Sequence, residues 1–178
     1  ESGDYYAGEV PTSGGNKTEF LGTALFDGDK MVGELNGDDT RVLLMTKNEF
    51  KRGAITVPDP MNPMSFATAE VKPQKSSAVK VAFSQGNPII NLKVFLEADL
   101  VNLQSDTNYE SEKLKPVLEN AFKTYIKAKL DKTIEKCKGL HCDVFGFGAK
   151  ASMKFMTIQE WEAYNWNKQF KNAEVTTE

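Results

Sequence analysis

The stretch Ser111–Gly139, SEKLKPVLENAFKTYIKAKLDKTIEKCKG, decides the fold because it predicts one long amphipathic helix. Its apolar residues recur at three- and four-residue spacing, which places them along one broad stripe of a helix. We expect the helix to run from about Glu112 to Lys138, with Ser111 as its N-cap and Gly139 in a left-handed terminating conformation. Pro116 is compatible with this helix only in its first turn. The stripe comprises Leu114, Val117, Leu118, Ala121, Phe122, Tyr125, Ile126, Leu130, Ile134 and Cys137.

A helix of this length depends on tertiary packing rather than on intrinsic propensity, so its stripe needs an apolar partner. The run of strands that precedes it is the candidate partner. Its other face is lysine-rich, with eight lysines against four acidic residues between Ser111 and Gly139. A solvated helix face explains these charges, and contact with anionic lipid head groups is the alternative.

Short apolar runs predict the strands and the short helix in the first half of the chain. FLGTALF, from Phe20, and MVGEL, from Met31, flank the Gly-containing connection Asp27–Lys30 and predict a β-hairpin. Acidic residues before an apolar cluster predict a short helix from about Asp38 to Lys47. The segment GAITVPDP, Gly53–Pro60, predicts a strand that its two prolines stop.

Three further β-type segments predict a meander: Ser65–Lys72, Ser77–Ser84 and Pro88–Leu103. Turns are expected at Pro73–Ser76 and at Gln85–Asn87. In the last segment apolar residues alternate with polar ones, which predicts an antiparallel sheet with one buried face. The long helix should lie on that face.

The C-terminal part predicts smaller elements. Leu140–Phe145 fits a short extended piece, and Gly146–Gly148 a turn. Thr157–Phe170 predicts a second helix, capped by Thr157, that packs its two tryptophans against the sheet edge or the first helix. Asn172–Glu178 fits an edge strand.

The predicted fold class is therefore α+β, an antiparallel β-sheet covered by one long amphipathic helix, with shorter flanking helices. Residues 1–19 lack periodicity and are expected to form a linker or arm, and residues 20–178 a single domain. A chain of 178 residues is long enough for one such domain with a tail.

Composition excludes some functions. The net charge of −3 gives no basic excess, so we expect no nucleic-acid partner. The sequence has no apolar run of the roughly 20 residues that a membrane span needs. It opens on ESGDYY without an initiator Met, which is typical of a processed protein or a fragment.

Two cysteines flank the only histidine, His141. Cys137, His141 and Cys142 could ligate zinc, but a structural zinc site needs four ligands and these residues offer three at most. We therefore predict no metal site. A disulfide between Cys137 and Cys142 is geometrically possible, and the spacing leaves it open.

Gly146–Ala151, GFGAKA, fits the dinucleotide fingerprint G-x-G-x-x-G/A. That motif requires a strand before it and a helix after it within a βαβ unit. Here a long helix precedes it and no parallel strand pattern follows. We therefore predict no nucleotide or other cofactor.

Glu97 and Asp99 should project from the same face of one strand and could act as a paired acid and base. Cross-strand ion pairing, with Lys80 as the expected partner, explains them without chemistry. No histidine, cysteine or metal ligand lies near them in sequence, so we predict no catalytic residues. Trp161 and Trp166 could form an aromatic binding platform, but their helical spacing favours core packing.

The order of these features resembles the C-terminal domain of the spore germination receptor C subunit, the GerAC/GerBC-type lipoprotein family. GTALFDGDKMVGEL and a short helix come first, then NLKVFLEADLVNLQS, the lysine-rich helix and DVFGFG. Trp161 and Trp166 follow, ahead of Phe170. The resemblance spans roughly Phe20 to Val175. The residues of DVFGFG and the tryptophans that carry it, in a structural or interaction role, are Asp143, Phe145, Gly146, Gly148, Trp161 and Trp166.

The resemblance implies a lipoprotein on the outer face of the spore inner membrane, held by an N-terminal lipid anchor that lies outside this chain. It implies assembly with integral-membrane A and B subunits into a nutrient-germinant receptor, and no catalytic activity. The expected function is a non-catalytic interaction domain. The alternative is a small-ligand-binding domain or soluble enzyme that uses the charged face around Glu97 and Asp99.

Overall fold

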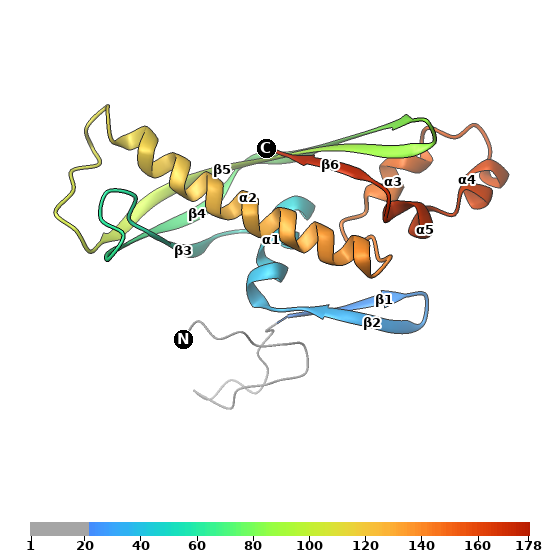
Figure 1. Cartoon of the computed structure of the whole chain (residues 1–178), viewed down its shortest axis with the longest axis horizontal. Helices are drawn as coiled ribbons and strands as arrows, with labels where there is room; N and C mark the ends of the chain where they lie inside the picture. The colour runs from blue at the N-terminus through green and yellow to red at the C-terminus, as the bar shows by residue number, and fades with distance from the viewer. Residues whose placement is uncertain (1–21) are drawn as a thin grey trace.

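The computed structural model describes residues 22–178, which form two sheets and a set of helices (Figure 1). The α+β class is confirmed, while the predicted arm over residues 1–19 lies outside the described residues. Within them, no helix combines the length and the apolarity that crossing a bilayer requires. In chain order the elements are β1 Thr23–Asp27, β2 Lys30–Leu35, α1 Gly37–Lys47, β3 Gly53–Pro58, β4 Phe66–Ser84, β5 Asn87–Leu103, α2 Lys115–Gly139, α3 Phe147–Ser152, α4 Ile158–Tyr164, α5 Trp166–Phe170 and β6 Glu174–Thr177.

The main sheet has the strand order β3-β4-β5-β6. β3, β4 and β5 are antiparallel neighbours, but β6 runs parallel to β5, so the prediction of a wholly antiparallel sheet is wrong at this edge. The reason is the path of the chain, which runs back along the sheet as α2 and passes through α3–α5 before β6 (Figure 1). A strand that re-enters after such a crossover runs in the same direction as the one it left.

β4 is one continuous strand, and the predicted turn at Pro73–Ser76 is wrong. Pro73 pairs with Leu96, and the register shifts on both sides of Lys75. The extra residues are therefore taken up as irregularities within the strand rather than as a turn. The ladder between β3 and β4 ends at Gly53 and Val71, so Pro73 removes no hydrogen bond from it.

The two predicted elements at the start of the domain are confirmed. β1 and β2 pair as an antiparallel hairpin that forms a separate two-stranded sheet. Gly28 in its turn has φ +64°, a conformation that glycine adopts without steric cost. The following helix, α1, is capped by Asn36, whose side chain accepts a hydrogen bond from the amide of Asp39 at 2.8 Å.

α2 begins at Lys115 and has Pro116 in its first turn, but both predicted caps are wrong. Leu114, not Ser111, is the N-cap, because Ser111 starts a separate turn in which its carbonyl accepts from the amides of Leu114 and Lys115. Gly139 is helical, and the left-handed residue is His141, at φ +54°. His141 N donates to the Lys138 carbonyl and Cys142 N to the Cys137 carbonyl, which is the pattern of a Schellman motif.

α2 crosses one face of the sheet and contacts β3 and β6 (Figure 1). It also packs against α1, so the sheet is not its sole partner. Two ion pairs join the helices, from Lys129 to Asp38 at 3.3 Å and from Lys136 to Asp39 at 3.9 Å. The side chains that α2 buries are Leu118, Phe122, Leu130, Thr133, Ile134 and Cys137.

The C-terminal elements differ from the prediction. Leu140–Phe145 forms turns rather than an extended piece, and α3 begins directly after Gly146, whose φ is +77°. Thr157 caps a helix as predicted, through the amide of Glu160 at 3.2 Å. That helix does not reach Phe170, because Asn165 adopts a left-handed conformation and separates α4 from α5. The edge position of β6 is confirmed.

Candidate functional site

The carboxylate of Asp143 is the centre of the residues singled out by sequence. Its Oδ2 accepts hydrogen bonds from Gly148 N at 2.6 Å and from Trp166 Nε1 at 2.8 Å. Its Oδ1 accepts from Phe147 N at 3.1 Å. Burial raises the pKa of Asp143, and these hydrogen bonds oppose that increase. Asp143 therefore ties the start of α3 to the start of α5.

Two glycines make this arrangement possible. A Cβ at Gly148 would lie 2.7 Å from Trp166 Nε1 and 3.2 Å from the Asp143 Oδ2. Glycine is therefore required where the backbone of α3 approaches the indole. Gly146 has a positive φ, which turns the chain so that the next two amides point at the Asp143 carboxylate.

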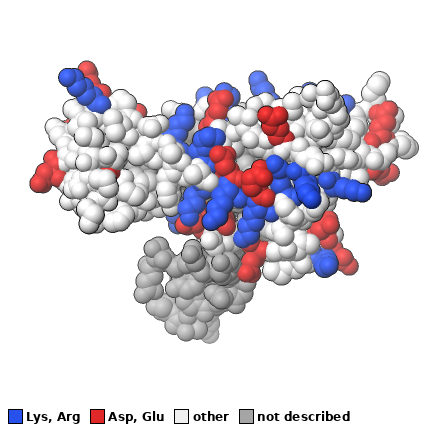
Figure 2. All heavy atoms as spheres, viewed as in Figure 1, with Lys and Arg blue, Asp and Glu red and all other residues white. Residues whose placement is uncertain are grey.

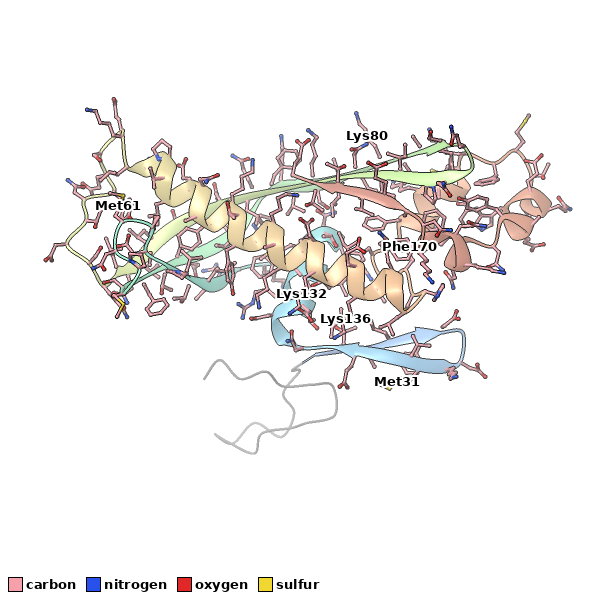
Figure 3. The ribbon with its side chains drawn as sticks, in the orientation of Figure 1. Met31, Met61, Lys80, Lys132, Lys136 and Phe170 are labelled. Atoms are coloured by element: carbon pink, nitrogen blue, oxygen red, sulfur yellow. The ribbon has the colours of Figure 1, made fainter. Side chains whose placement is uncertain are left out.

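Aromatic rings extend this network. Phe145 stacks on Phe147 with ring centroids 5.3 Å apart, and Phe147 contacts Phe170 at 6.1 Å. Trp166 stacks on Phe170 at 5.9 Å and on Trp161 at 5.7 Å. Phe170, labelled in Figure 3, is fully buried. The structure thus brings all six motif residues into one cluster, named here the motif cluster: Asp143, Phe145, Gly146, Gly148, Trp161 and Trp166.

The motif cluster is joined to the far end of the β4–β5 hairpin. Phe83 of β4 makes edge contacts with Phe155 and Tyr164, each at 5.4 Å. The hydroxyl of Tyr164 donates to the carbonyl of Gly86, in the hairpin turn, at 2.8 Å. Trp166 is buried and Trp161 is partly buried, and both tryptophans contact Tyr164, which links them to the hairpin end.

The dinucleotide fingerprint has a different use in this fold. The amides of Phe147 and Gly148, at the start of α3, are those that would bind an anion, and Asp143 occupies both. Turns rather than a strand precede the motif. A parallel strand, β6, does follow, contrary to the sequence expectation, but it pairs with β5, which lies before α2.

The two cysteines are buried free thiols. Burial raises the pKa of Cys137 to about 12, and burial likewise raises the pKa of Cys142. The thiol of Cys142 donates to the Phe26 carbonyl at 3.1 Å, which links the end of α2 to β1. Within residues 22–178, no group of three or more His, Cys, Asp and Glu side chains is arranged to hold a metal ion.

Glu97 and Asp99 lie on the same face of β5, but their partner is Lys72 rather than the predicted Lys80. Lys72 Nζ lies 3.2 Å from Glu97 Oε1 and 3.2 Å from Asp99 Oδ2. β4 continues through Pro73 and pairs Lys72 with Glu97, whereas Lys80 pairs with Asn91, several residues away along β5. Hydrogen bonds from Lys72 to Asp99 and Glu97 raise the pKa of Lys72, which favours its charged form.

Sequence reasoning missed a buried carboxylate, Asp59, after β3. It accepts hydrogen bonds from the hydroxyls of Tyr109 and Ser105 and from the amide of Met61 at 2.8 Å. Burial alone would raise the pKa of Asp59, but these hydrogen bonds lower it. Asp59 stands between two prolines, a setting typical of an Asx turn, but nothing local points to Tyr109, fifty residues away.

An open groove of about 610 Å³ runs between the end of β3 and the first half of α2. Its rim includes Val117, which is 38% exposed. Its lining is mostly apolar and comprises Val57, Pro58, Pro60, Pro116, Val117, Asn120, Ala121, Thr124 and Tyr125.

Lysines gather on the outer face of α2, with acidic side chains among them (Figure 2). Lys127 lies 3.2 Å from Asp131, and Lys138 lies 2.7 Å from Glu135. Lys132 and Lys136 come from the same helix (Figure 3). Pairing of this kind is expected on a solvated helix face.

Comparison with known proteins identifies the family. Residues 21–178 match the family described as spore germination B3/GerAC-like, C-terminal. The spore germination protein GerQC of Bacillus cereus is 23% identical over 158 residues, which cover 89% of this chain and 43% of that protein. The crystal structure of the GerBC protein has a similar fold, with a TM-score of 0.65 and 18% identity over 90% of this chain and 50% of that one.

The chain thus spans half or less of the length of these two relatives. The family match itself covers nearly the whole of it, including every element of the fold and the complete motif cluster. The resemblance inferred from the order of sequence features is confirmed: the chain belongs to the GerAC-like C-terminal family of spore germination proteins.

Proposed function

We propose that this chain is a non-catalytic interaction domain of a nutrient-germinant receptor lipoprotein, and that it supports receptor assembly and the signalling that triggers germination. The observation that carries the proposal is the family match over residues 21–178. In the full-length protein an N-terminal lipid anchor would hold the domain at the outer face of the spore inner membrane. Its partners there would be the A and B membrane subunits of the receptor.

The described carboxylates support a non-catalytic role because each candidate is committed to a structural partner. Asp143 accepts three hydrogen bonds from α3 and Trp166. Glu97 and Asp99 share Lys72 on an exposed face of the sheet. A general acid or base must be free to exchange a proton with substrate, and these contacts oppose that.

We propose that the motif cluster is structural. Its hydrogen bonds and ring contacts hold α3, α4 and α5 against the β4–β5 hairpin. It would therefore fix the shape of one end of the domain, while the contact surface for the receptor subunits lies elsewhere. The groove beside α2 is open and mostly apolar, and we propose it for such a contact.

Deleting the domain from the intact gene tests the proposal. We expect lower levels of the other receptor subunits, measured by immunoblot, and a weaker response to nutrients. Normal subunit levels together with a normal nutrient response would contradict it.

A point variant separates interaction from folding. Val117→Glu puts a charge on the rim of the groove without burying it, since Val117 is partly exposed. We expect it to reduce recovery of the A and B subunits with the full-length protein while leaving the level of that protein unchanged. Met64→Glu, at a position 90% exposed outside the groove, is the matched control and should have no effect.

Calorimetry against amino acids, sugars and nucleosides distinguishes the alternative, a small-ligand-binding domain or enzyme that uses the face around Glu97 and Asp99. The proposal predicts no saturable heat with this chain. Tight binding that Glu97→Gln abolishes would favour the alternative.

A further inference from the structure

Large apolar side chains are unusually exposed in Met153–Ile158, the loop between α3 and α4 together with the first residue of α4, called here the methionine loop. Met153 is 72% exposed, Met156 93% and Ile158 72%. The loop lies at one end of the molecule, beside the turn of the β4–β5 hairpin (Figure 1). Single exposed apolar residues are ordinary, but three within six residues mark an interaction surface.

The methionine loop is held in place. Between Met153 and Met156, the ring of Phe155 turns inward and contacts Phe83, Trp161 and Tyr164 at 5.1–5.4 Å. At the start of α4, Thr157 Oγ1 accepts from Glu160 N at 3.2 Å, and Glu160 Oε2 accepts from Met156 N at 3.1 Å. The exposure of the two methionines is therefore a feature of a fixed conformation.

The backbone amides of four consecutive residues of the methionine loop already have acceptors. The amides of Met153 and Lys154 donate to the Ala151 carbonyl, and that of Phe155 donates to the Ser152 carbonyl at 3.1 Å. Met156 N donates to the Glu160 side chain. Entry into an apolar medium is costly for unpaired backbone donors, so this pairing removes the main obstacle.

Lysines precede and lie within the methionine loop, and two glutamates, Glu160 and Glu162, follow it in α4. Lys150 and Lys154 are exposed, and they are the only charged residues between Ala149 and Gln159. From Phe147 to Lys171 the chain carries four lysines and two glutamates, Glu160 and Glu162, in a protein whose net charge is −3. Exposed apolar side chains flanked by lysines complement an anionic lipid surface, because lysines reach head groups while the apolar groups enter the acyl boundary.

A loop at the opposite end of the molecule also exposes methionines and serves as a comparison. Met61 is 54% exposed and Met64 90%, so apolar side chains are exposed there too. Their loop, Asp59–Phe66, contains no lysine. The two loops therefore share exposed methionines, and lysine lies within the methionine loop but not within Asp59–Phe66.

We propose that the methionine loop inserts into the head-group region of an anionic phospholipid bilayer, with Met153, Met156 and Ile158 entering the interface and Lys150 and Lys154 contacting phosphates. This lipid contact belongs to the domain itself and is separate from the receptor-subunit contacts proposed above. A vesicle assay without receptor subunits tests it independently of them.

The experiment is sedimentation of the 178-residue chain with vesicles of mixed phosphatidylglycerol and phosphatidylcholine, against vesicles of phosphatidylcholine alone. We expect binding to the anionic vesicles that weakens as salt is raised. Met156→Glu should weaken it about tenfold, since it puts a charge in place of an apolar group that enters the lipid interface. Lys154→Gln should weaken it about fivefold, the usual contribution of one lysine near an anionic surface.

Met64→Glu is the matched control, because it places the same charge at an equally exposed methionine at the other end, and it should leave binding unchanged. Circular dichroism melting confirms that each variant folds. Quenching of Trp161 and Trp166 fluorescence by lipids brominated near the head group should occur with the wild-type chain and be lost in Met156→Glu.

Three results would overturn the proposal. The first is absence of wild-type binding to anionic vesicles. The second is equal binding by Met156→Glu and the wild-type chain, which would leave a purely electrostatic contact. The third combines two observations: the wild-type chain does not bind vesicles, and Met156→Glu in the full-length protein reduces recovery of the receptor subunits. That result would assign the methionine loop to a protein partner.

Discussion

The indole N–H of Trp166 donates a 2.8 Å hydrogen bond to the carboxylate of Asp143, which lies 23 residues earlier in the chain. The same oxygen accepts from the amide of Gly148. One side chain thus connects α3 and α5, and its loss leaves hydrogen-bond donors of both helices without an acceptor.

Asp143→Ala should therefore destabilise the domain by about 2–3 kcal/mol, because three donors in a partly buried site lose their acceptor. Asp143→Asn retains one acceptor oxygen and should cost less. Urea unfolding followed by tryptophan fluorescence measures both. Equal stability of Asp143→Ala and the wild-type chain would show that water replaces the carboxylate at little cost.

Gly148→Ala tests the close approach of α3 to Trp166. The added Cβ would lie 2.7 Å from the indole nitrogen, so the ring must shift and weaken its bond to Asp143. We expect a loss of about 1–3 kcal/mol. Gly139→Ala is the matched control, since this helical glycine has open space around its Cβ position. It should gain about 0.5–1 kcal/mol, and both changes are read from thermal melting.

Short sequence patterns correctly predicted the elements that depend on residues close together in the chain. The Asp-Gly connection gave the β1–β2 hairpin, the acidic residues before Val42 gave α1, and Thr157 was correctly identified as a cap. Each of these depends on residues within a few positions of one another. The alternation in β5 was also real up to Leu96, but Leu100 is 44% exposed and lies on the half of β5 with which β6 does not pair.

The incorrect predictions concern positions whose structure depends on residues far away in the sequence. Pro73 is tolerated inside β4 because β3 has already ended, which the sequence near Pro73 does not reveal. The helix over Thr157–Phe170 breaks at Asn165, beside the Trp166 indole that bonds to Asp143. For the candidate site, the motif residues were identified through family resemblance, whereas their hydrogen bonds depend on tertiary contacts that no spacing rule predicts.

The thiols of Cys137 and Cys142 should be unreactive in the folded domain. Both are buried, and burial raises the pKa of Cys137 to about 12, so little thiolate forms near neutral pH. An aromatic disulfide reagent at pH 8 should label neither in buffer and both in urea. Rapid labelling of one thiol in buffer would indicate local opening at the end of α2.

Asp59 and Asp143 should affect the pH dependence of stability in opposite directions. Hydrogen bonds lower the pKa of folded Asp59 below 3.8, so its contribution is present above that pH and is lost as the pH falls through the folded pKa. Burial raises the pKa of folded Asp143 above 3.8, so stability is lost from this site as the pH rises through the folded pKa.

Asp59→Asn should therefore flatten the acid limb of a plot of unfolding free energy against pH, and Asp143→Asn should steepen it. Urea unfolding at a series of pH values measures both slopes, with Asn as the matched replacement at each site. Parallel curves for the two variants would mean that the pKa values of the two carboxylates are not shifted in opposite directions by folding.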